Sequence, residues 1–294
     1  MGPTTSDLTF ELAGHVVNRV GLGAKRLLRD DTYTAEDRAG AVRLLRRAVE
    51  LGVNHLDTAA FYPSFAPSSG PVNDFTSLDI ANELIREALA PYPDDLLIAT
   101  KVGPTPDGMA RPDQLAALVE ADLRALGRDH LDLVYLRQGG LESVVEHFGV
   151  LAELQRAGLV RHLGLSSVRA EHLAQAQALA PVVAVSNRYA VDFGRVNDEL
   201  LESCREQGIA FVPFFALTGE RREVGGVAAD DVVNAVARAH SATPAQVRLA
   251  WTLSRGPHVL VIPGTSSQAH LAENLAAADL ELSAAELEEL TALG

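Results

Sequence analysis

The chain has 294 residues and a formal net charge of −14, from 25 lysines and arginines against 39 aspartates and glutamates. This acidic balance argues against a nucleic-acid partner, because phosphate backbones are bound by clustered lysine and arginine. The single cysteine, Cys204, excludes an intramolecular disulfide framework and a zinc site built from cysteines. No apolar run approaches the ~20 residues of a membrane helix, and the N-terminus lacks a signal-peptide pattern, so we expect a cytoplasmic protein without membrane contact.

Short β-branched runs alternate with longer amphipathic segments along the chain, and the helical segments repeat apolar residues at three- and four-residue intervals. The predicted strands are Val20–Gly23, Asn54–Thr58, Leu96–Lys101, Leu131–Leu136, Leu163–Ser166, Val182–Ser186, Ala210–Phe215 and Val259–Ile262. The predicted helices are Asp37–Leu51, Ser77–Ala90, Arg111–Leu126, Leu141–Ala157, Ala170–Ala180, Val196–Gln207, Asp230–His240 and Ala245–Ser254, with a further helix start at Gln268. Four helices are followed by a glycine suited to a left-handed cap: Gly52, Gly127, Gly158 and Gly208.

Eight strand–helix repeats can close into a barrel, which leaves no exposed sheet edge. Runs such as LLIA and VVAV are continuously apolar, as strands covered on both faces are. An open doubly wound sheet is the alternative, but Gly21-Leu22-Gly23 lacks the third glycine of the phosphate-binding turn. We therefore predict one α/β domain over residues 1–294, a (β/α)8 TIM barrel, with an N-terminal hairpin that turns at Ala13-Gly14 and plugs the base.

Residues 63–76, PSFAPSSGPVNDFT, form a segment rich in turn formers and without a helical or strand period. The segment follows the second predicted strand, which places it at the catalytic end of a barrel. Two interpretations are open, a solvated surface loop or a lid that faces the substrate.

Polar side chains at the carboxyl ends of barrel strands point into the mouth, where active sites form. Asp57 and Lys101 each end an apolar strand, and Tyr62 follows Asp57 by five residues. A buried ammonium needs a counter-ion, so Asp57 is expected to pair with Lys101. The cation would lower the tyrosine pKa from its usual ~10 and suit Tyr62 to protonate a carbonyl oxygen. The alternative is an ion pair without a catalytic role, with Tyr62 packed in the core.

The order of these residues along the chain resembles the aldo-keto reductases. The matching motifs are HLDTAAFY (Asp57, Tyr62), IATK (Lys101), GLSS (Ser166), VSNRY (Ser186, Asn187) and IPGTSSQAHLAEN, which runs to Asn274. The run ANELIREALAPYPDDLLIATKVG is most similar to the branch that includes pyridoxal reductases. The resemblance covers about residues 18–290 and implies a barrel with a base hairpin and NADP(H) bound across its mouth. It also implies that Asp57, Tyr62 and Lys101 are three of four catalytic residues.

The fourth catalytic position departs from the family pattern. Where the family usually has histidine after an apolar strand, this chain has Arg137, which is permanently charged and offers a rigid fork of donors. Arg137 can polarise the carbonyl, or it can bind a substrate carboxylate or phosphate. An internal ion pair without substrate contact is the third interpretation. A fixed cation near Tyr62 would also lower the tyrosine pKa further.

The resemblance implies a set of cofactor-binding residues along the mouth. They are Gly23, Ser166, Ser186, Asn187, Phe214, Phe215, Leu217, Gly219, Ile262, Gly264, Thr265, Ser266, His270, Glu273 and Asn274. Ser166 would hold the nicotinamide carboxamide, although the glutamine usual at position 186 is serine here. Phe214 would stack on the nicotinamide ring, with core packing as its alternative role, and Gly219 belongs to the stretch over the pyrophosphate.

The adenosine end of the implied cofactor site lacks its basic residues. Gly264 stands where the family has lysine, and His270 stands where it has arginine. Thr265, Ser266 and the amides at the helix start can still bind a 2′-phosphate, because a helix N-terminus attracts anions. We predict NADP(H) as the cofactor and do not exclude NAD(H).

Together these features predict an NAD(P)H-dependent oxidoreductase that reduces an aldehyde or ketone, a small-molecule carbonyl substrate, with Tyr62 as proton donor. One alternative is a catalytically altered nucleotide-binding barrel with a regulatory or scaffold role. Another is a lyase or isomerase that uses Tyr62 as a base. The long segment at residues 63–76 favours a larger or anionic carbonyl compound over pyridoxal, and we expect a monomer or small homo-oligomer.

Other side chains that could bind a metal or act as a nucleophile have simpler interpretations. No metal site is predicted, because the histidines on helices or at their ends lack a metal-ligand spacing and are expected at the surface or an interface: His147, His162, His172 and His240. Trp251 is expected in the core, and Cys204 lacks a neighbouring base that would make it a nucleophile.

Overall fold

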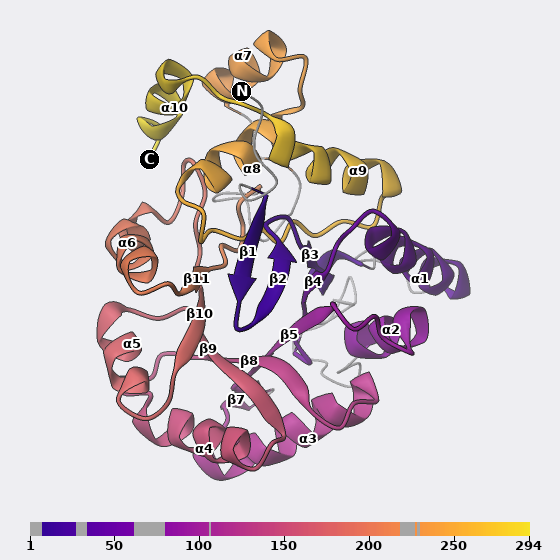
Figure 1. Cartoon of the computed structure of the whole chain (residues 1–294), viewed down its shortest axis with the longest axis vertical. Coiled ribbons are helices and arrows are strands. Elements are labelled where there is room, and N and C mark those ends of the chain that lie inside the picture. Colours follow the sequence, from indigo (N-terminus) through magenta and orange to yellow (C-terminus); the bar gives the residue numbers. More distant parts are fainter. Residues whose placement is uncertain (1–7, 28–33, 62–79, 106, 218–226, 228–229) are drawn as a thin grey trace.

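In the computed structural model, a parallel sheet curls around the centre of the molecule inside a ring of helices (Figure 1). The structure describes residues 8–27, 34–61, 80–105, 107–217, 227 and 230–294. The strands are β1 (Thr9–Leu12), β2 (His15–Asn18), β3 (Leu22–Gly23), β4 (His55–Asp57), β5 (Leu97–Val102), β6 (Pro104–Thr105), β7 (Gly108–Met109), β8 (Leu131–Arg137), β9 (Val160–Ser166), β10 (Val182–Ser186) and β11 (Ala210–Phe211). The helices are α1 (Ala35–Glu50), α2 (Ile80–Leu89), α3 (Leu115–Leu126), α4 (Val145–Arg156), α5 (Ala170–Gln177), α6 (Asp198–Glu206), α7 (Asp231–Ala239), α8 (Pro244–Ser254), α9 (Gln268–Ala276) and α10 (Ala284–Thr291).

The two ends of the sheet meet, which closes it into the predicted TIM barrel. Strands pair in parallel in the order β11-β10-β9-β8-β5-β4-β3. In the segment after α8, Val259 bridges to Phe211 of β11, and Val261 bridges to Val20 beside β3. The backbone N–H of Leu260 donates to the carbonyl of Phe211 at 3.0 Å. The predicted eighth strand thus completes the barrel through single bridges rather than as a regular strand.

Alternation along the strands sends one set of side chains into the barrel, where they form an inner cluster. Its members are Leu12, Val17, Leu97, Ala99, Leu133, Tyr135, Ala184, Ala210, Val212 and Leu260. Leu12 and Val17 come from the β1–β2 hairpin, which lies at the centre of the ring of strands in Figure 1. Its turn residues Ala13 and Gly14 have φ of 54° and 82°, which suits the tight turn of a two-residue hairpin loop. The predicted base hairpin is confirmed.

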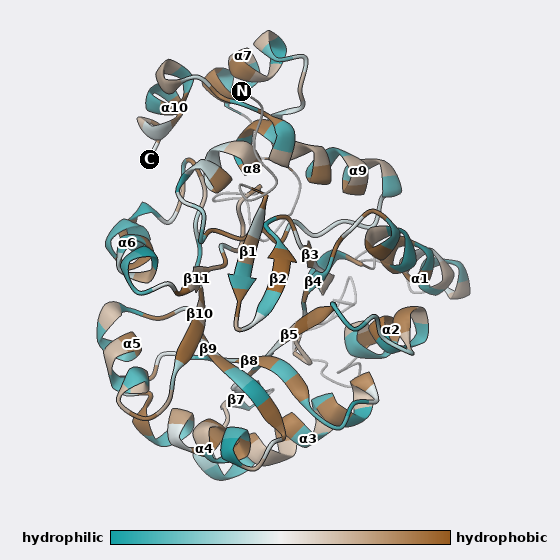
Figure 2. Ribbon diagram, viewed as in Figure 1, coloured by the Kyte–Doolittle hydropathy of each residue, from teal (hydrophilic) through white to brown (hydrophobic). Residues whose placement is uncertain are grey.

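A larger core fills the space between the outer faces of the strands and the helices. Figure 2 shows apolar ribbon along the strands and polar segments on the outward surfaces of the helices. All four predicted cap glycines have left-handed φ, between 65° and 93°: Gly52, Gly127, Gly158 and Gly208. Helix α1 begins before the predicted Asp37 because Thr34 and Asp37 form a capping box, each side chain accepting the other's backbone N–H.

Several elements differ from the predictions, among them α4, which begins at Val145 rather than Leu141. Strand β11 ends at Phe211 rather than 215, since Pro213 has no N–H for the ladder. The β6–β7 hairpin and helix α10 were not predicted, although Ser283 and Glu286 form a capping box that marks the start of α10. Within the described ranges, no helix has the length and apolar character needed to cross a membrane.

Candidate active site

The predicted polar residues gather at the mouth, the rim formed by the carboxyl ends of the parallel strands. Asp57 ends β4, and Lys101 lies one residue before the end of β5. Arg137 on β8 pairs with Ser166 on β9, which pairs in turn with Ser186 on β10. Since parallel strands all end on one side of a barrel, these five side chains come from the same rim.

Asp57 and Lys101 form the expected ion pair. Lys101 Nζ donates to Asp57 Oδ1, and it also donates to the backbone carbonyl of Thr58 at 3.2 Å. The two side chains are at most 2% exposed, so both charges are buried. The ammonium lies 5.7 Å from the centre of the Tyr135 ring, whose face favours a cation.

A buried hydrogen-bond network on the outer side of the strands holds the backbone next to this pair. Because side chains alternate along a strand, Thr58 and Thr100 point outward, toward α2 and α3. Thr58 Oγ1 donates to Asn82 Oδ1 at 2.8 Å, and Asn82 Nδ2 donates to Asp122 Oδ1 at 3.0 Å. Thr100 Oγ1 donates to the other oxygen of Asp122 at 2.6 Å, and all four side chains are fully buried. The sequence analysis missed this network, although a polar residue on the apolar face of each helix was its signal.

His55 lies on the inward face of β4, two residues before Asp57. It is fully buried, and neither ring nitrogen has a hydrogen-bond partner among the described residues. Burial lowers the pKa of His55 to about 4, while Asp57 raises it and Lys101 lowers it by smaller amounts. Gly21 makes room for the ring, because a β-carbon there would lie 3.0 Å from Nδ1. The ion pair therefore stands above a neutral imidazole.

Two cations flank a pair of aromatic rings at the mouth. The guanidinium of half-buried Arg137 lies 5.2 Å from the centre of the Phe214 ring. Phe214 and Phe215 pack edge to face at 4.9 Å, and Lys25 Nζ lies 5.4 Å from the centre of the Phe215 ring. Phe214 is itself only half-buried, so it lines the mouth rather than packing in the core.

Two adjacent hydroxyls at the mouth are suited to a polar ligand. Ser166 and Ser186 are fully buried, and their hydroxyls have no hydrogen-bond partner in the described part of the chain. Buried polar groups are almost always satisfied, and an amide could both donate to and accept from such hydroxyls. Asn187 differs, because its amide accepts from Val168 N and donates to Val168 O and Asn197 Oδ1, at 2.7–3.0 Å.

The backbone is strained at two points of the mouth. Ser167, after β9, has φ of 61°, and Phe215 has φ of 67°, in the left-handed region that side-chain-bearing residues rarely adopt. Ser167 is held there by its neighbours, since its N–H donates to Ser186 O at 3.0 Å and its carbonyl accepts from Gln138 Nε2 at 2.6 Å. Strain of this kind concentrates at binding and catalytic sites.

The residues predicted for the adenosine end lie in the loop before α9 and on α9 itself. The backbones of Gly23 and Gly264 approach closely, because a β-carbon on Gly264 would lie 3.0 Å from the carbonyl oxygen of Gly23. A β-carbon on Gly23 would lie 2.7 Å from the carbonyl oxygen of Ile262. Thr265 is buried, and its hydroxyl accepts from Ser267 N at 3.0 Å. The exposed or partly exposed members are Ser266, His270 and Glu273, and the buried member is Asn274.

Several predictions concern residues outside the described ranges: Tyr62, Gly219 and the segment 63–76. Leu217 is the last described residue before Gly219, and it packs against a small hydrophobic cluster beside the barrel.

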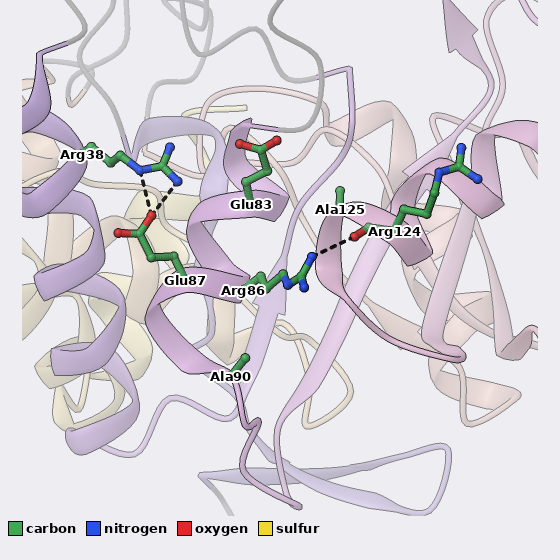
Figure 3. Close-up of a pocket in the computed structure, with 7 residues that line it drawn as sticks. All are labelled: Arg38, Glu83, Arg86, Glu87, Ala90, Arg124 and Ala125. Carbon is green, nitrogen blue, oxygen red and sulfur yellow. Dashed lines mark hydrogen bonds and ion pairs between the residues drawn. The ribbon is translucent and has the colours of Figure 1, made fainter.

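A cavity of about 400 Å³ lies on the outer helical layer, between α1, α2 and α3 (Figure 3). Three of its charged side chains, Arg38, Arg86 and Glu87, are engaged with protein groups. Arg38 pairs with Glu87 at 2.5 Å, and Arg86 donates to the carbonyl of Arg124 at 3.3 Å. We assign no ligand to this cavity.

The expectation that these histidines lie at the surface is wrong for two of them, and His162 lies within β9 rather than on a helix or at its end. His172 is fully buried, and His147 is 8% exposed and bonds through Nε2 to the carbonyl of Ala110 at 2.8 Å. These helix positions face the outer core, where one ring nitrogen can reach a backbone group. Trp251 is fully buried, as predicted, and burial raises the pKa of the Cys204 thiol to about 12, which disfavours the nucleophilic thiolate.

Comparisons with known proteins agree with this geometry. The model of the Aldo/keto reductase family matches residues 19–294. Pyridoxine 4-dehydrogenase of Escherichia coli (strain K12) is 42% identical, over 95% of this chain and 95% of that protein. An uncharacterized oxidoreductase of Schizosaccharomyces pombe is 34% identical, over 94% of this chain and 86% of that protein.

Solved structures show the same fold. The thermostable aldo-keto reductase Tm1743, in complex with the inhibitor epalrestat, has a TM-score of 0.81 at 29% identity, covering 98% of this chain and 100% of that one. An aldo/keto reductase from Klebsiella pneumoniae, in complex with NADP and acetate, has a TM-score of 0.79 at 26% identity, covering 97% and 95% of the two chains.

Proposed function

The chain belongs to the aldo/keto reductase family of oxidoreductases, and from this premise we propose that it is an NADPH-dependent carbonyl reductase. The observation that carries the proposal is the buried Lys101–Asp57 pair at the mouth. A buried ion pair adds little net stability, so its presence at the strand ends favours a chemical role. The Klebsiella pneumoniae relative that was solved with NADP supports the choice of cofactor.

The chain's own residues divide the proton chemistry between them. Bound NADPH supplies a hydride to the carbonyl carbon. Tyr62 donates its phenolic proton to the carbonyl oxygen and is left as a phenolate. The ammonium of Lys101 lowers the pKa of this phenol by stabilising the phenolate, and Asp57 keeps the ammonium in place. In this proposal both charged groups act through Tyr62.

The buried hydroxyls at the mouth fit the nicotinamide end of the cofactor. We propose that Ser166 and Ser186 hold its carboxamide, which would satisfy two hydroxyls that have no partner within the described residues. Phe214 offers a half-exposed ring for stacking. Asn187 supports the same wall indirectly, because its amide ties the loop after β9 to the chain after β10.

Arg137 would orient the substrate. Its guanidinium lies against Phe214, and Lys25 lies against Phe215, so the aromatic wall of the mouth carries positive charge at both ends. This supports a carbonyl substrate with a carboxylate or phosphate, which a guanidinium binds through two parallel hydrogen bonds. Pyridoxal has neither a carboxylate nor a phosphate. Because one relative is a pyridoxine 4-dehydrogenase, pyridoxal is a suitable neutral substrate for comparison.

The proposal is tested by titrating the purified protein with NADPH and with NADH, followed by the fluorescence of the reduced nicotinamide. A panel of carbonyl compounds, pyridoxal and 2-oxo acids included, is then screened for loss of NADPH absorbance. We expect binding of NADPH and stoichiometric oxidation with at least one carbonyl compound. A folded protein that binds neither nucleotide would refute the proposal and favour a role without this cofactor. Binding of NADPH without oxidation by any carbonyl compound would favour the nucleotide-binding scaffold.

Turnover without nicotinamide oxidation would instead favour a lyase or isomerase. A cytoplasmic location and a monomeric or small homo-oligomeric state remain predictions.

A further inference from the structure

Two consecutive cations, Lys25 and Arg26, lie in the 3-10 helix η2 (Ala24–Arg26), which follows β3, and their side chains have different neighbours. Lys25 Nζ lies over the ring of Phe215. Arg26 is half-buried, and its Cβ and Cγ each lie 3.2 Å from the position that a β-carbon on Gly264 would occupy. The stem of Arg26 therefore fills the space that a side chain at position 264 would need.

The loop that Arg26 contacts is where a barrel commonly binds phosphate. TIM barrels form such sites from the loops after their last strands together with the N-terminus of a short extra helix. Here Gly264 lies in that loop, and α9 follows it, with the side chain of Ser267 as N-cap. Thr265 is buried and bonded within the loop, so the loop has a fixed shape.

Electrostatics also require a cation at this place. The chain carries a formal net charge of −14, and so its overall field repels a polyanionic nucleotide. A 2′-phosphate adds nearly two further negative charges, as phosphate monoesters do at neutral pH. Position 264 offers no side chain, and His270 is an exposed residue of α9.

We propose that Arg26 supplies the cation for the 2′-phosphate of the cofactor and thereby makes the protein prefer NADPH to NADH. The positions of Arg26 and Gly264 depend on each other, because the stem of the arginine can lie over the loop only while position 264 has no side chain. The cation thus reaches the phosphate from the loop after β3 instead of the loop before α9. This inference rests on the proposed function, since it assumes that the nucleotide binds along the mouth.

The test compares NADPH and NADH binding in Arg26→Gln, again through the fluorescence of the reduced nicotinamide. We expect the NADPH affinity to fall about 10- to 100-fold, the factor that loss of a hydrogen bond to a charged group produces, and the NADH affinity to stay within about twofold. Arg47→Gln is the matched control. It removes the same charge from an exposed side chain of α1, where Arg47 pairs with Glu50, so it should leave the ratio of the two affinities unchanged.

A swap variant separates the role of the charge from damage to the loop. In Arg26→Ala/Gly264→Lys, the Cγ and guanidinium of residue 26 are removed, while its Cβ and the carbonyl oxygen of Gly23 must each shift by a few tenths of an ångström to admit the lysine. We expect part of the NADPH preference to return. Gly264→Lys alone should not raise the preference, because the Arg26 stem occupies the same space. Circular dichroism melts of each variant without nucleotide check that the fold is intact.

The outcomes distinguish this inference from the function on which it rests. The inference is wrong if Arg26→Gln leaves the ratio of the NADPH and NADH affinities unchanged, including the case in which both affinities fall equally. It is also wrong if the native protein already prefers NADH. In each case the proposed reductase function still stands. If the native protein binds neither nucleotide, the proposed function itself fails.

Discussion

His55 makes the protein's stability depend on pH in a way that can be calculated from the structure. The imidazole is fully buried beneath the Asp57–Lys101 pair, and burial lowers its pKa from 6.5 to about 4. In the unfolded chain, His55 is exposed to water and takes up a proton as the pH falls below 6.5. In the folded protein it stays neutral until about pH 4. Between these values the unfolded state binds more protons, so the free energy of unfolding must decrease as the pH falls.

The size of the effect follows from linkage. Each pKa unit corresponds to about 1.4 kcal/mol, so the full shift of His55 amounts to about 3 kcal/mol. Most of this loss occurs between pH 7 and pH 4.5, where we expect His55 to account for about 2.5 kcal/mol of the free energy of unfolding. Against a typical total of about 5–15 kcal/mol, such a loss is readily measured.

The assay is urea unfolding, with refolding as the check of reversibility, for the native protein and His55→Leu at pH 7 and at pH 4.5. Leucine keeps an apolar side chain beneath the pair and removes the titrating group. Other buried histidines, such as His258, titrate alike in both proteins, so the difference between them isolates His55. We expect the native protein to lose about 2.5 kcal/mol more than the variant on going to pH 4.5. Equal losses of unfolding free energy in the two proteins would show that the pKa of His55 is not lowered in the folded protein.

Four further predictions concern the mouth and its support. Tyr62→Phe should retain NADPH affinity and lose about 10²- to 10⁴-fold in kcat, measured by steady-state NADPH oxidation; lost nucleotide binding would contradict its role as proton donor. Lys101→Met leaves the Asp57 carboxylate buried without its cation and should cost about 3–5 kcal/mol in urea unfolding at pH 7, and an unchanged midpoint would contradict this. Asp122→Ala removes the acceptor of two buried donors and should cost about 2–4 kcal/mol in the same assay, whereas a neutral result would show that water replaces the carboxylate. Arg137→Gln should raise KM for an anionic carbonyl compound about 10- to 100-fold while pyridoxal kinetics stay within about threefold; an equal loss of kcat with both would favour polarisation of the carbonyl instead.

Much of the fold could be predicted from local patterns. Strand and helix periods, the four cap glycines and the Ala13-Gly14 turn each depend on residues close together in the chain. The Asp57–Lys101 pair was also predictable, because each residue ends an apolar strand and a buried charge requires a partner. The predicted end of β11 was wrong because the local signal of Pro213 was not applied: proline has no N–H for the ladder, and the strand ends at Phe211.

Only the tertiary structure decided which distant side chains meet. Arg137 lies against Phe214, and Arg26 lies over Gly264, although each pair is far apart in sequence. Asp122 reaches Thr100 across the space between a helix and a strand. These contacts depend on strand register, on closure of the barrel and on how the helices seat against it, none of which has a short-range signal. The amino-acid sequence by itself determined the repeating units and the residues at their ends, since propensity and alternation act over a few residues. The burial of His55 and the surroundings of each cation were settled by packing, because desolvation depends on every element around a group.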